Sequence, residues 1–279
     1  MLPAALLFGL GSLLLTGLFD ILYRLAHRRS FHESSYLVVQ TAVVSTVLAA
    51  LGFGGVGWRL DAATAGLGVL AGVVGITTGW TYLYAMGRGP ASVTAAVRRL
   101  NFVVTGGLAL IFLGERLSLG KVTAMLLAGA ALIVMGTAGS RLERPHPVIY
   151  VTVVMAGLMA FTHKLAAVAG VSPAAFLICQ SLTAHLSAHV MCHRSGGYAL
   201  DRWTIGYAAA TGTTVAVAMT LGVYALRHGD AVVVAPLLQL GFLVTAPVSF
   251  LLLGERPSPR KLSALLIAAS AVVLFAREL

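Results

Sequence analysis

Ten stretches of mostly apolar residues divide the chain, and short polar connections separate them. A helix needs ~20 such residues to cross a bilayer, where its backbone polar groups must bond within the helix. Each stretch therefore predicts one transmembrane helix. The predicted helices cover residues 3–25, 35–55, 63–86, 90–112, 119–138, 147–167, 174–193, 203–226, 231–252 and 260–276.

The small share of charged residues excludes an ordinary soluble protein. Of 279 residues, 58% are hydrophobic and 10% are charged, whereas soluble domains carry about 25% charged residues. The net charge of +10 is spread one to three basic residues at a time between the apolar stretches, where such residues orient helices and meet anionic lipid headgroups. We therefore expect membrane lipids and no nucleic acid as partners, and a multi-pass protein of the bacterial inner (plasma) membrane.

The second half of the chain repeats the first at a constant offset of 140 residues. Because each half holds five predicted helices, an odd number, the second half must enter the membrane from the opposite side. We expect an all-α membrane protein with ten transmembrane helices as two inverted five-helix repeats, residues 1–139 and 141–279. The matched residues include Gly17 with Gly157, Gln40 with Gln180, Asp61 with Asp201, Thr105 with Thr245, and Leu113–Arg116 with Leu253–Arg256.

Inverted repeats are typical of carriers that work by alternating access, with the substrate site near the midplane between the repeats. A flippase for a lipid-linked intermediate would share this architecture. The sequence has no Gly-x-x-x-x-Gly-Lys-Ser/Thr loop for ATP, and no nucleophile–base pair stands out. We therefore expect a secondary transporter and not an enzyme, with no cofactor.

Three segments of each half carry a family resemblance: Tyr84–Val93, Phe102–Thr105 and Leu113–Leu117 in the first half, and Tyr224–Ala231, Ala235–Leu240 and Leu253–Arg256 in the second. Through them each half resembles the EamA domain of the drug/metabolite transporter superfamily. This resemblance implies a ten-helix permease and favours an exporter. We expect a small metabolite as its substrate, such as an amino acid or organic anion, and a proton or counter-substrate as a further partner. Many members have a proline in the fourth helix where this chain has Phe102.

Two adjacent arginines lie deep inside a predicted helix. Arg98 and Arg99 are eight and nine residues into the helix 90–112, ~12–14 Å into a hydrocarbon core ~30 Å thick. A charge there costs at least ~2.5–3.5 kcal/mol, so it normally faces a cavity or a partner. Guanidinium groups bind carboxylate or phosphate through paired hydrogen bonds, which predicts anion binding. A structural ion pair or a backbone contact is the alternative. The counterparts are Leu238 and Gln239, and this asymmetry favours function.

Further polar side chains inside the predicted helices complete the candidate site. Asn101 bonds either a substrate or a neighbouring helix, and Gln180 and Gln239 are further candidates for substrate binding. Asp20 lies inside the first predicted helix, away from its ends. It is either a carboxylate that couples transport to protons or the partner of Arg24 four residues later.

Three histidines recur at every fourth position of the predicted helix 174–193 and so share one helix face: His185, His189 and His193. Two histidines at this spacing can bind zinc, but no carboxylate or thiolate cluster accompanies them, and we predict no metal site. The remaining alternatives are a proton relay, a polar cavity lining and ordinary buried or interfacial histidines. His185 is our candidate for substrate binding and His189 our candidate for coupling.

Other polar and aromatic residues point to structural roles. Glu115-Arg116 and Glu255-Arg256 recur at the ends of the two fourth helices, which predicts a turn or a clamp between helices. His163 and Lys164 fall near the end of a predicted helix, where we expect both at the interface with Lys164 extended toward water. An interfacial belt is favoured over a stacking platform for the aromatic residues Trp80, Tyr82 and Tyr84.

Overall fold

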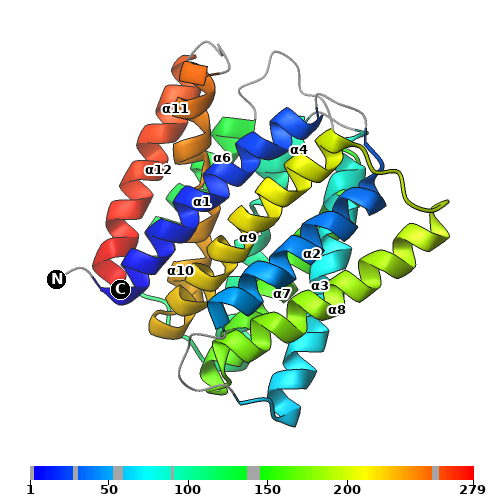
Figure 1. Ribbon diagram of the computed structural model, residues 1–279. Helices are drawn as coiled ribbons and strands as arrows, with labels where there is room; N and C mark the ends of the chain where they lie inside the picture. The colour runs from blue at the N-terminus through cyan, green and yellow to red at the C-terminus, as the bar shows by residue number, and fades with distance from the viewer. Residues whose placement is uncertain (1–2, 28–30, 53–58, 89–90, 137–144, 253–257) are drawn as a thin grey trace.

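The computed structural model describes residues 3–27, 31–52, 59–88, 91–136, 145–252 and 258–279, and these fold into a bundle of helices (Figure 1). The helices are α1 (Ala4–His27), α2 (Glu33–Gly52), α3 (Ala62–Met86), α4 (Ala91–Arg98), α5 (Asn101–Leu113), α6 (Leu119–Gly136), α7 (Val148–Val168), α8 (Pro173–Arg194), α9 (Arg202–His228), α10 (Ala231–Gln239), α11 (Phe242–Leu252) and α12 (Pro259–Glu278).

The apolar helices confirm the predicted membrane architecture. Within the described ranges, nine spans are long and apolar enough to cross a bilayer, and Leu119–Met135 forms a shorter apolar helix. Both chain ends lie at the same end of the bundle (Figure 1), where Ala5, Leu226 and Leu279 belong to one apolar cluster. An even number of crossings requires this placement.

Helices of the two halves interlock, and nearly every contact between halves has a counterpart at the 140-residue offset. Helix α1 packs on α9 as α7 packs on α3, and α3 packs on α8 as α9 packs on α2. Helices α2 and α8 occupy matched positions in the two halves and pack on each other, and α6 and α12 do the same. A two-fold axis between the halves maps each of these two contacts onto itself. The pattern fits two inverted repeats related by one pseudo-two-fold axis.

Matched aspartates begin the third helix of each half. The Asp61 carboxylate accepts a hydrogen bond of 2.8 Å from the Thr64 backbone N–H, and Asp201 accepts one of 2.6 Å from Thr204. These bonds satisfy donors that the first helical turn leaves free. The Thr64 N–H also holds the pKa of the exposed Asp61 carboxyl below its usual value. The Asp61–Asp201 match in the sequence is therefore a repeated N-cap.

Matched glycines bring the repeats into close contact. A Cβ atom on Gly72 would lie 2.6 Å from the Gln180 carbonyl oxygen, and one on Gly212 would lie 2.7 Å from the Gln40 carbonyl oxygen. Both positions need glycine because any side chain would push the partner helix away. In a bilayer, such close backbone contact is a main source of helix association.

The fourth span of each half is broken, whereas the sequence predicted one continuous helix in each. The breaks overlap at the 140-residue offset, with Arg99-Leu100 between α4 and α5 and Leu240-Gly241 between α10 and α11. At each break the backbone tightens to bonds three residues apart: Leu100 N–H to Val97 O and Leu240 N–H to Leu237 O, at 3.0 and 3.1 Å. Broken helices are tolerated at membrane depth where protein surrounds them, so tertiary contacts override the apolar pattern here.

Glu115 forms a clamp between the halves, in agreement with its predicted structural role. Its carboxylate accepts hydrogen bonds from the backbone N–H groups of Ala231 and Val232 at the start of α10, at 2.8 and 3.0 Å. It also pairs with the Lys164 ammonium at 3.3 Å. The repeated Glu255-Arg256 lies outside the described residues.

The expectation that His163 and Lys164 lie at the interface is wrong, because both are buried. The Lys164 ammonium donates to the Gly229 and Leu226 carbonyl oxygens at 2.7 and 3.2 Å in addition to pairing with Glu115. These partners replace the water that a lysine near a helix end usually reaches. His163 bonds Gln180 instead.

Candidate substrate-binding site

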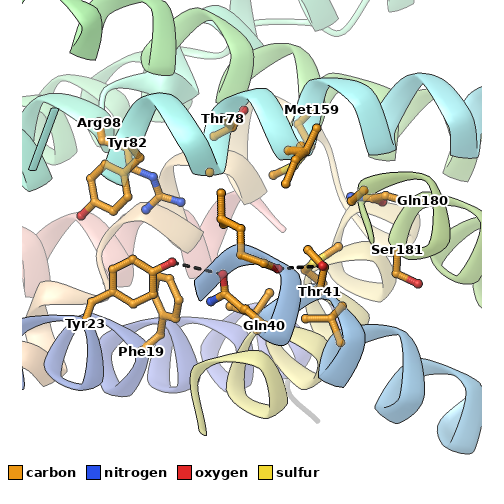
Figure 2. A pocket seen from close by; sticks show the side chains of 18 residues that line it. Phe19, Tyr23, Gln40, Thr41, Thr78, Tyr82, Arg98, Met159, Gln180 and Ser181 are labelled. Carbon is orange, nitrogen blue, oxygen red and sulfur yellow. Dashed lines mark hydrogen bonds between the residues drawn. The ribbon is translucent and has the colours of Figure 1, made fainter. Parts of the chain in front are cut away.

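A cavity of about 140 Å³ lies between the two halves, and Figure 2 shows its lining. Helices α1, α2 and α3 of the first half and α7, α8 and α9 of the second half supply the lining, and α4 adds Arg98. The lining residues are Phe19, Tyr23, Leu37, Gln40, Thr41, Val44, Gly75, Ile76, Thr78, Gly79, Tyr82, Arg98, Met159, Gln180, Ser181, Ala184, Val215 and Met219.

The lining follows the repeat, which places the cavity on the pseudo-two-fold axis. The Tyr23 hydroxyl donates to the Gln40 side-chain oxygen at 3.2 Å. At the matched positions, His163 Nε2 bonds the Gln180 side-chain oxygen at 2.9 Å. Phe19 and Met159 are matched as well, as are Thr41 and Ser181. Cavities on such an axis are where inverted-repeat carriers hold their substrates.

Arg98 and Tyr82 break this symmetry. The Arg98 guanidinium carbon lies 4.6 Å from the centre of the Tyr82 ring, and both side chains line the cavity (Figure 2). The structure records no salt bridge for Arg98 within the described part of the chain, and its buried Nε has no hydrogen-bond partner there. The matched residues are Gly222 and Leu238. The first half thus adds a cation and an aromatic ring where the second half has neither.

Arg99 lies on the same axis but is held inside the protein. Its guanidinium forms an ion pair with Asp20 and donates to the backbone carbonyl oxygen of Gln239, its own repeat counterpart. Its side chain is 4% exposed, and it is not among the cavity residues. The Thr245 hydroxyl lies 3.4 Å from the Asp20 carboxylate. These contacts match the structural ion pair and the backbone contact that the sequence left open, and they make Arg99 a partner of Asp20. The side chain of Arg24, the partner that the sequence predicted, lies outside the described part of the structure.

The other predicted site residues fall in different places. Gln180 lines the cavity, whereas Asn101 and Gln239 are not among its lining residues. Asn101 is buried, and its side-chain oxygen has no hydrogen-bond partner among the described residues. His185 bonds the cavity residue Thr41, with 3.0 Å between Nδ1 and Oγ1, and His189 bonds His185.

Sequence reasoning missed most of the first-half lining. Gln40 was recognised as the match of Gln180, but only Gln180 entered the candidate site. Applying the 140-residue offset to every candidate finds Gln40 as the counterpart of Gln180. Tyr23 gave no such signal, because its counterpart His163 was expected at the interface. Tyr82 was assigned to an interfacial belt, yet it is 4% exposed and faces Arg98. How deeply the Tyr82 side chain is buried depends on which helices pack around it, and the pattern of apolar residues does not specify that packing.

Comparisons with known proteins agree with this geometry. No curated protein matches the sequence. A solved structure described as "Crystal structure of protein" is 19% identical, with 99% of this chain and 98% of that chain covered and a TM-score of 0.77, which shows a shared fold. The model of the EamA-like transporter family matches residues 3–137 and 146–277. Its members are transporters and not enzymes, so a small-molecule substrate is implied. The chain belongs to the EamA-like transporter family, within the drug/metabolite transporter superfamily.

Proposed function

We propose that this transporter exports a small metabolite with an anionic group and an apolar, ring-sized body across the bacterial inner membrane. The observation that carries the proposal is the Arg98 guanidinium, which lines the cavity without a salt bridge among the described residues. A cation inside a membrane protein is costly unless an anion or a polar partner offsets it. A substrate carboxylate, sulfonate or phosphate would fill that role through paired hydrogen bonds.

The remaining lining supports an apolar or aromatic body. Phe19, Tyr23 and Tyr82 line the cavity together with the guanidinium (Figure 2), and aliphatic side chains complete the wall. A closed apolar cavity of ~150 Å³ is large enough for a benzene ring, and the cavity here has a volume of about 140 Å³. Gln40 and Gln180 add polar side chains that can bond an amino or carbonyl group. An organic anion or an amino acid with an apolar side chain fits this lining.

Alternating access and outward direction belong to the same proposal. A cavity on the axis between inverted halves can open to either side as the halves rock. The outward direction rests on the export activity common among proteins that resemble this one.

The test uses ligands that share one phenyl ring and differ in charge. The ligands are benzylsulfonate, L-phenylalanine and phenethylamine, which carry an anion, a zwitterion and a cation. A ligand that binds the folded state raises its thermal stability by mass action. We expect benzylsulfonate and L-phenylalanine to stabilise the purified protein and phenethylamine to have no effect. Arg98→Gln should abolish the benzylsulfonate effect, whereas Arg88→Gln, which alters a surface pair with Glu33, should preserve it.

Other outcomes would change the proposal. Stabilisation by phenethylamine alone would overturn the anion site. Binding of benzylsulfonate that survives Arg98→Gln would move the anion site elsewhere. If none of the soluble ligands acts but a lipid-linked anion does, the protein is a flippase. Export itself is measured as uptake into inside-out membrane vesicles.

A further inference from the structure

A continuous chain of hydrogen bonds leads from the cavity to the protein surface. Thr41 lines the cavity, and its Oγ1 lies 3.0 Å from His185 Nδ1. The Nε2 atoms of His185 and His189 are 3.1 Å apart, and His189 Nδ1 lies 2.6 Å from the Tyr198 hydroxyl. Tyr198 follows α8 and is 45% exposed. Both ring nitrogens of His185 and both ring nitrogens of His189 therefore form hydrogen bonds within this one path.

This chain can hold its hydrogens in either direction. In one arrangement Tyr198 donates to His189, His189 donates to His185, and His185 donates to Thr41, whose hydroxyl donates to the Leu37 carbonyl oxygen at 2.7 Å. In the other arrangement every donor and acceptor between Thr41 and Tyr198 is exchanged. The two neutral imidazole tautomers permit both. A proton that enters at one end and leaves at the other converts one arrangement into the other.

The histidine pair has room for one additional proton. If one imidazole is protonated, a single N–H still lies between the two Nε2 atoms. If both were protonated, two donors would face each other across 3.1 Å. The rings meet edge to face, with centroids 4.5 Å apart, so packing fixes their orientation. The pair can thus pass protons one at a time.

Nearby titratable groups on the packed elements have contacts of their own. Glu33 on α2 pairs with Arg88 at 3.6 Å, and His32 bonds Ser35 and the Ser195 carbonyl oxygen.

The nearby tyrosines also have partners. Tyr84 on α3 stacks on Arg88, and Tyr36 on α2 bonds Thr211 of α9. The His193 ring meets the Tyr198 ring edge to face, with the ring centroids 5.4 Å apart. Cys192 bonds the Gly197 carbonyl oxygen.

We propose that Thr41, His185, His189 and Tyr198 form a proton path through which this transporter couples substrate movement to proton movement. A proton from the surface binds His189 Nδ1. This nitrogen then donates to the Tyr198 hydroxyl oxygen instead of accepting from it. The proton on His189 Nε2 then passes to His185 Nε2, and His185 releases its Nδ1 proton toward Thr41 and the cavity. The path rests on the proposed role of the cavity as the substrate site.

The first experiment separates exchange from proton-coupled transport in phosphatidylethanolamine–phosphatidylglycerol vesicles. Labelled benzylsulfonate is the probe because it stays ionised and does not carry protons through lipid by itself. Exchange of labelled for unlabelled probe needs no net proton movement, whereas net movement driven by a pH gradient does. We expect His189→Gln to preserve exchange and to lower proton-driven movement ~100-fold or more. Tyr198→Phe should also lower it, and the control His193→Gln should preserve both activities.

Two results would overturn the path. One is proton-driven movement that survives both His189→Gln and Tyr198→Phe. The other comes from nitrogen NMR of imidazole-labelled protein in lipid nanodiscs, which needs no substrate. We expect a nitrogen–nitrogen coupling between His185 Nε2 and His189 Nε2, because a single N–H lies between these two atoms, and we expect it to disappear in His189→Gln. If the wild-type protein lacks this coupling, the two imidazoles share no hydrogen bond and the path is absent.

The NMR readout also keeps the two proposals distinguishable. Wild-type protein that neither binds nor exchanges benzylsulfonate would count against the proposed substrate class. The nitrogen–nitrogen coupling between the two histidines in that same protein would still support the proton path.

Discussion

The two halves of the molecule are alike where they hold each other, but they differ at the part of the cavity that Arg98 and Tyr82 line. Gly72 and Gly212 make the same backbone contact, and Asp61 and Asp201 make the same helix cap. At the cavity, by contrast, the first half presents Tyr82 and Arg98 where the second has Gly222 and Leu238. A Cβ on Gly222 would lie 3.6 Å from a Leu238 methyl group, so these partners remain neighbours in both halves. The repeated residues build the scaffold, and the departures supply chemistry.

The largest effect should come from breaking the clamp between halves. Glu115→Gln leaves the Lys164 charge buried without its carboxylate, and such changes cost ~3–5 kcal/mol. We expect a markedly lower thermal midpoint in detergent. Glu278→Gln, at an exposed carboxylate near Ser118, serves as the control and should change little. If Glu255→Gln is equally damaging, the clamp is a repeated feature, and if it is harmless, the clamp belongs to one half.

The next largest effect tests the symmetry of the glycine contacts. Gly72→Ala and Gly212→Ala each insert a methyl group against a backbone carbonyl, which costs about 1–3 kcal/mol. We expect similar losses of thermal stability from the two changes. Gly107→Ala, at a helical position with no atom within 4 Å of the added Cβ, should not destabilise. Unequal losses at Gly72 and Gly212 would show that the halves pack differently despite their matched geometry.

Removing the ring beside Arg98 should weaken binding without abolishing it. A desolvated cation–π contact is worth ~1–2 kcal/mol, so Tyr82→Leu should lower benzylsulfonate affinity about 5- to 30-fold. Tyr84→Leu is the matched control, because the Tyr84 ring stacks on Arg88 at 3.6 Å outside the cavity lining. Isothermal titration calorimetry measures both. Equal losses from the two variants would remove Tyr82 from the site.

The smallest effect should follow from replacing one residue of the first half with its counterpart from the second half. Tyr23→His introduces the residue found at the matched position, and its ring can bond Gln40 as His163 bonds Gln180. We expect a stability change below ~1.5 kcal/mol and benzylsulfonate affinity close to that of the wild type. A large loss in either would show that the tyrosine ring itself, and not the matched hydrogen bond, is required.

The sequence was sufficient to predict the architecture because the features that specify it can be read directly along the chain. These features are the length of the apolar stretches, the charged residues between them and the constant offset of 140 residues. It predicted the spans, the duplication and the inverted arrangement. It could not predict the breaks at Leu100 and Leu240, since these depend on contacts between helices from opposite halves. The pair of Asp20 and Arg99 was missed for the same reason, because the two residues are 79 positions apart in the sequence and meet only in the folded bundle. A search for site residues pair by pair along the repeat would have recovered more of the cavity than a search for charges.

The interlocked packing of the halves also affects how the protein is made. Helix α1 finds its main partner in α9, and α3 finds its partners in α7 and α8, all of which are synthesised later. The first five spans therefore enter the membrane before the surfaces that cover them exist, and chains elongate at only ~5–20 residues per second. During that interval lipid must cover the faces that Gly72 and Gln40 later present to the second half. Assembly of the bundle is thus a late event, completed after the last spans have been inserted.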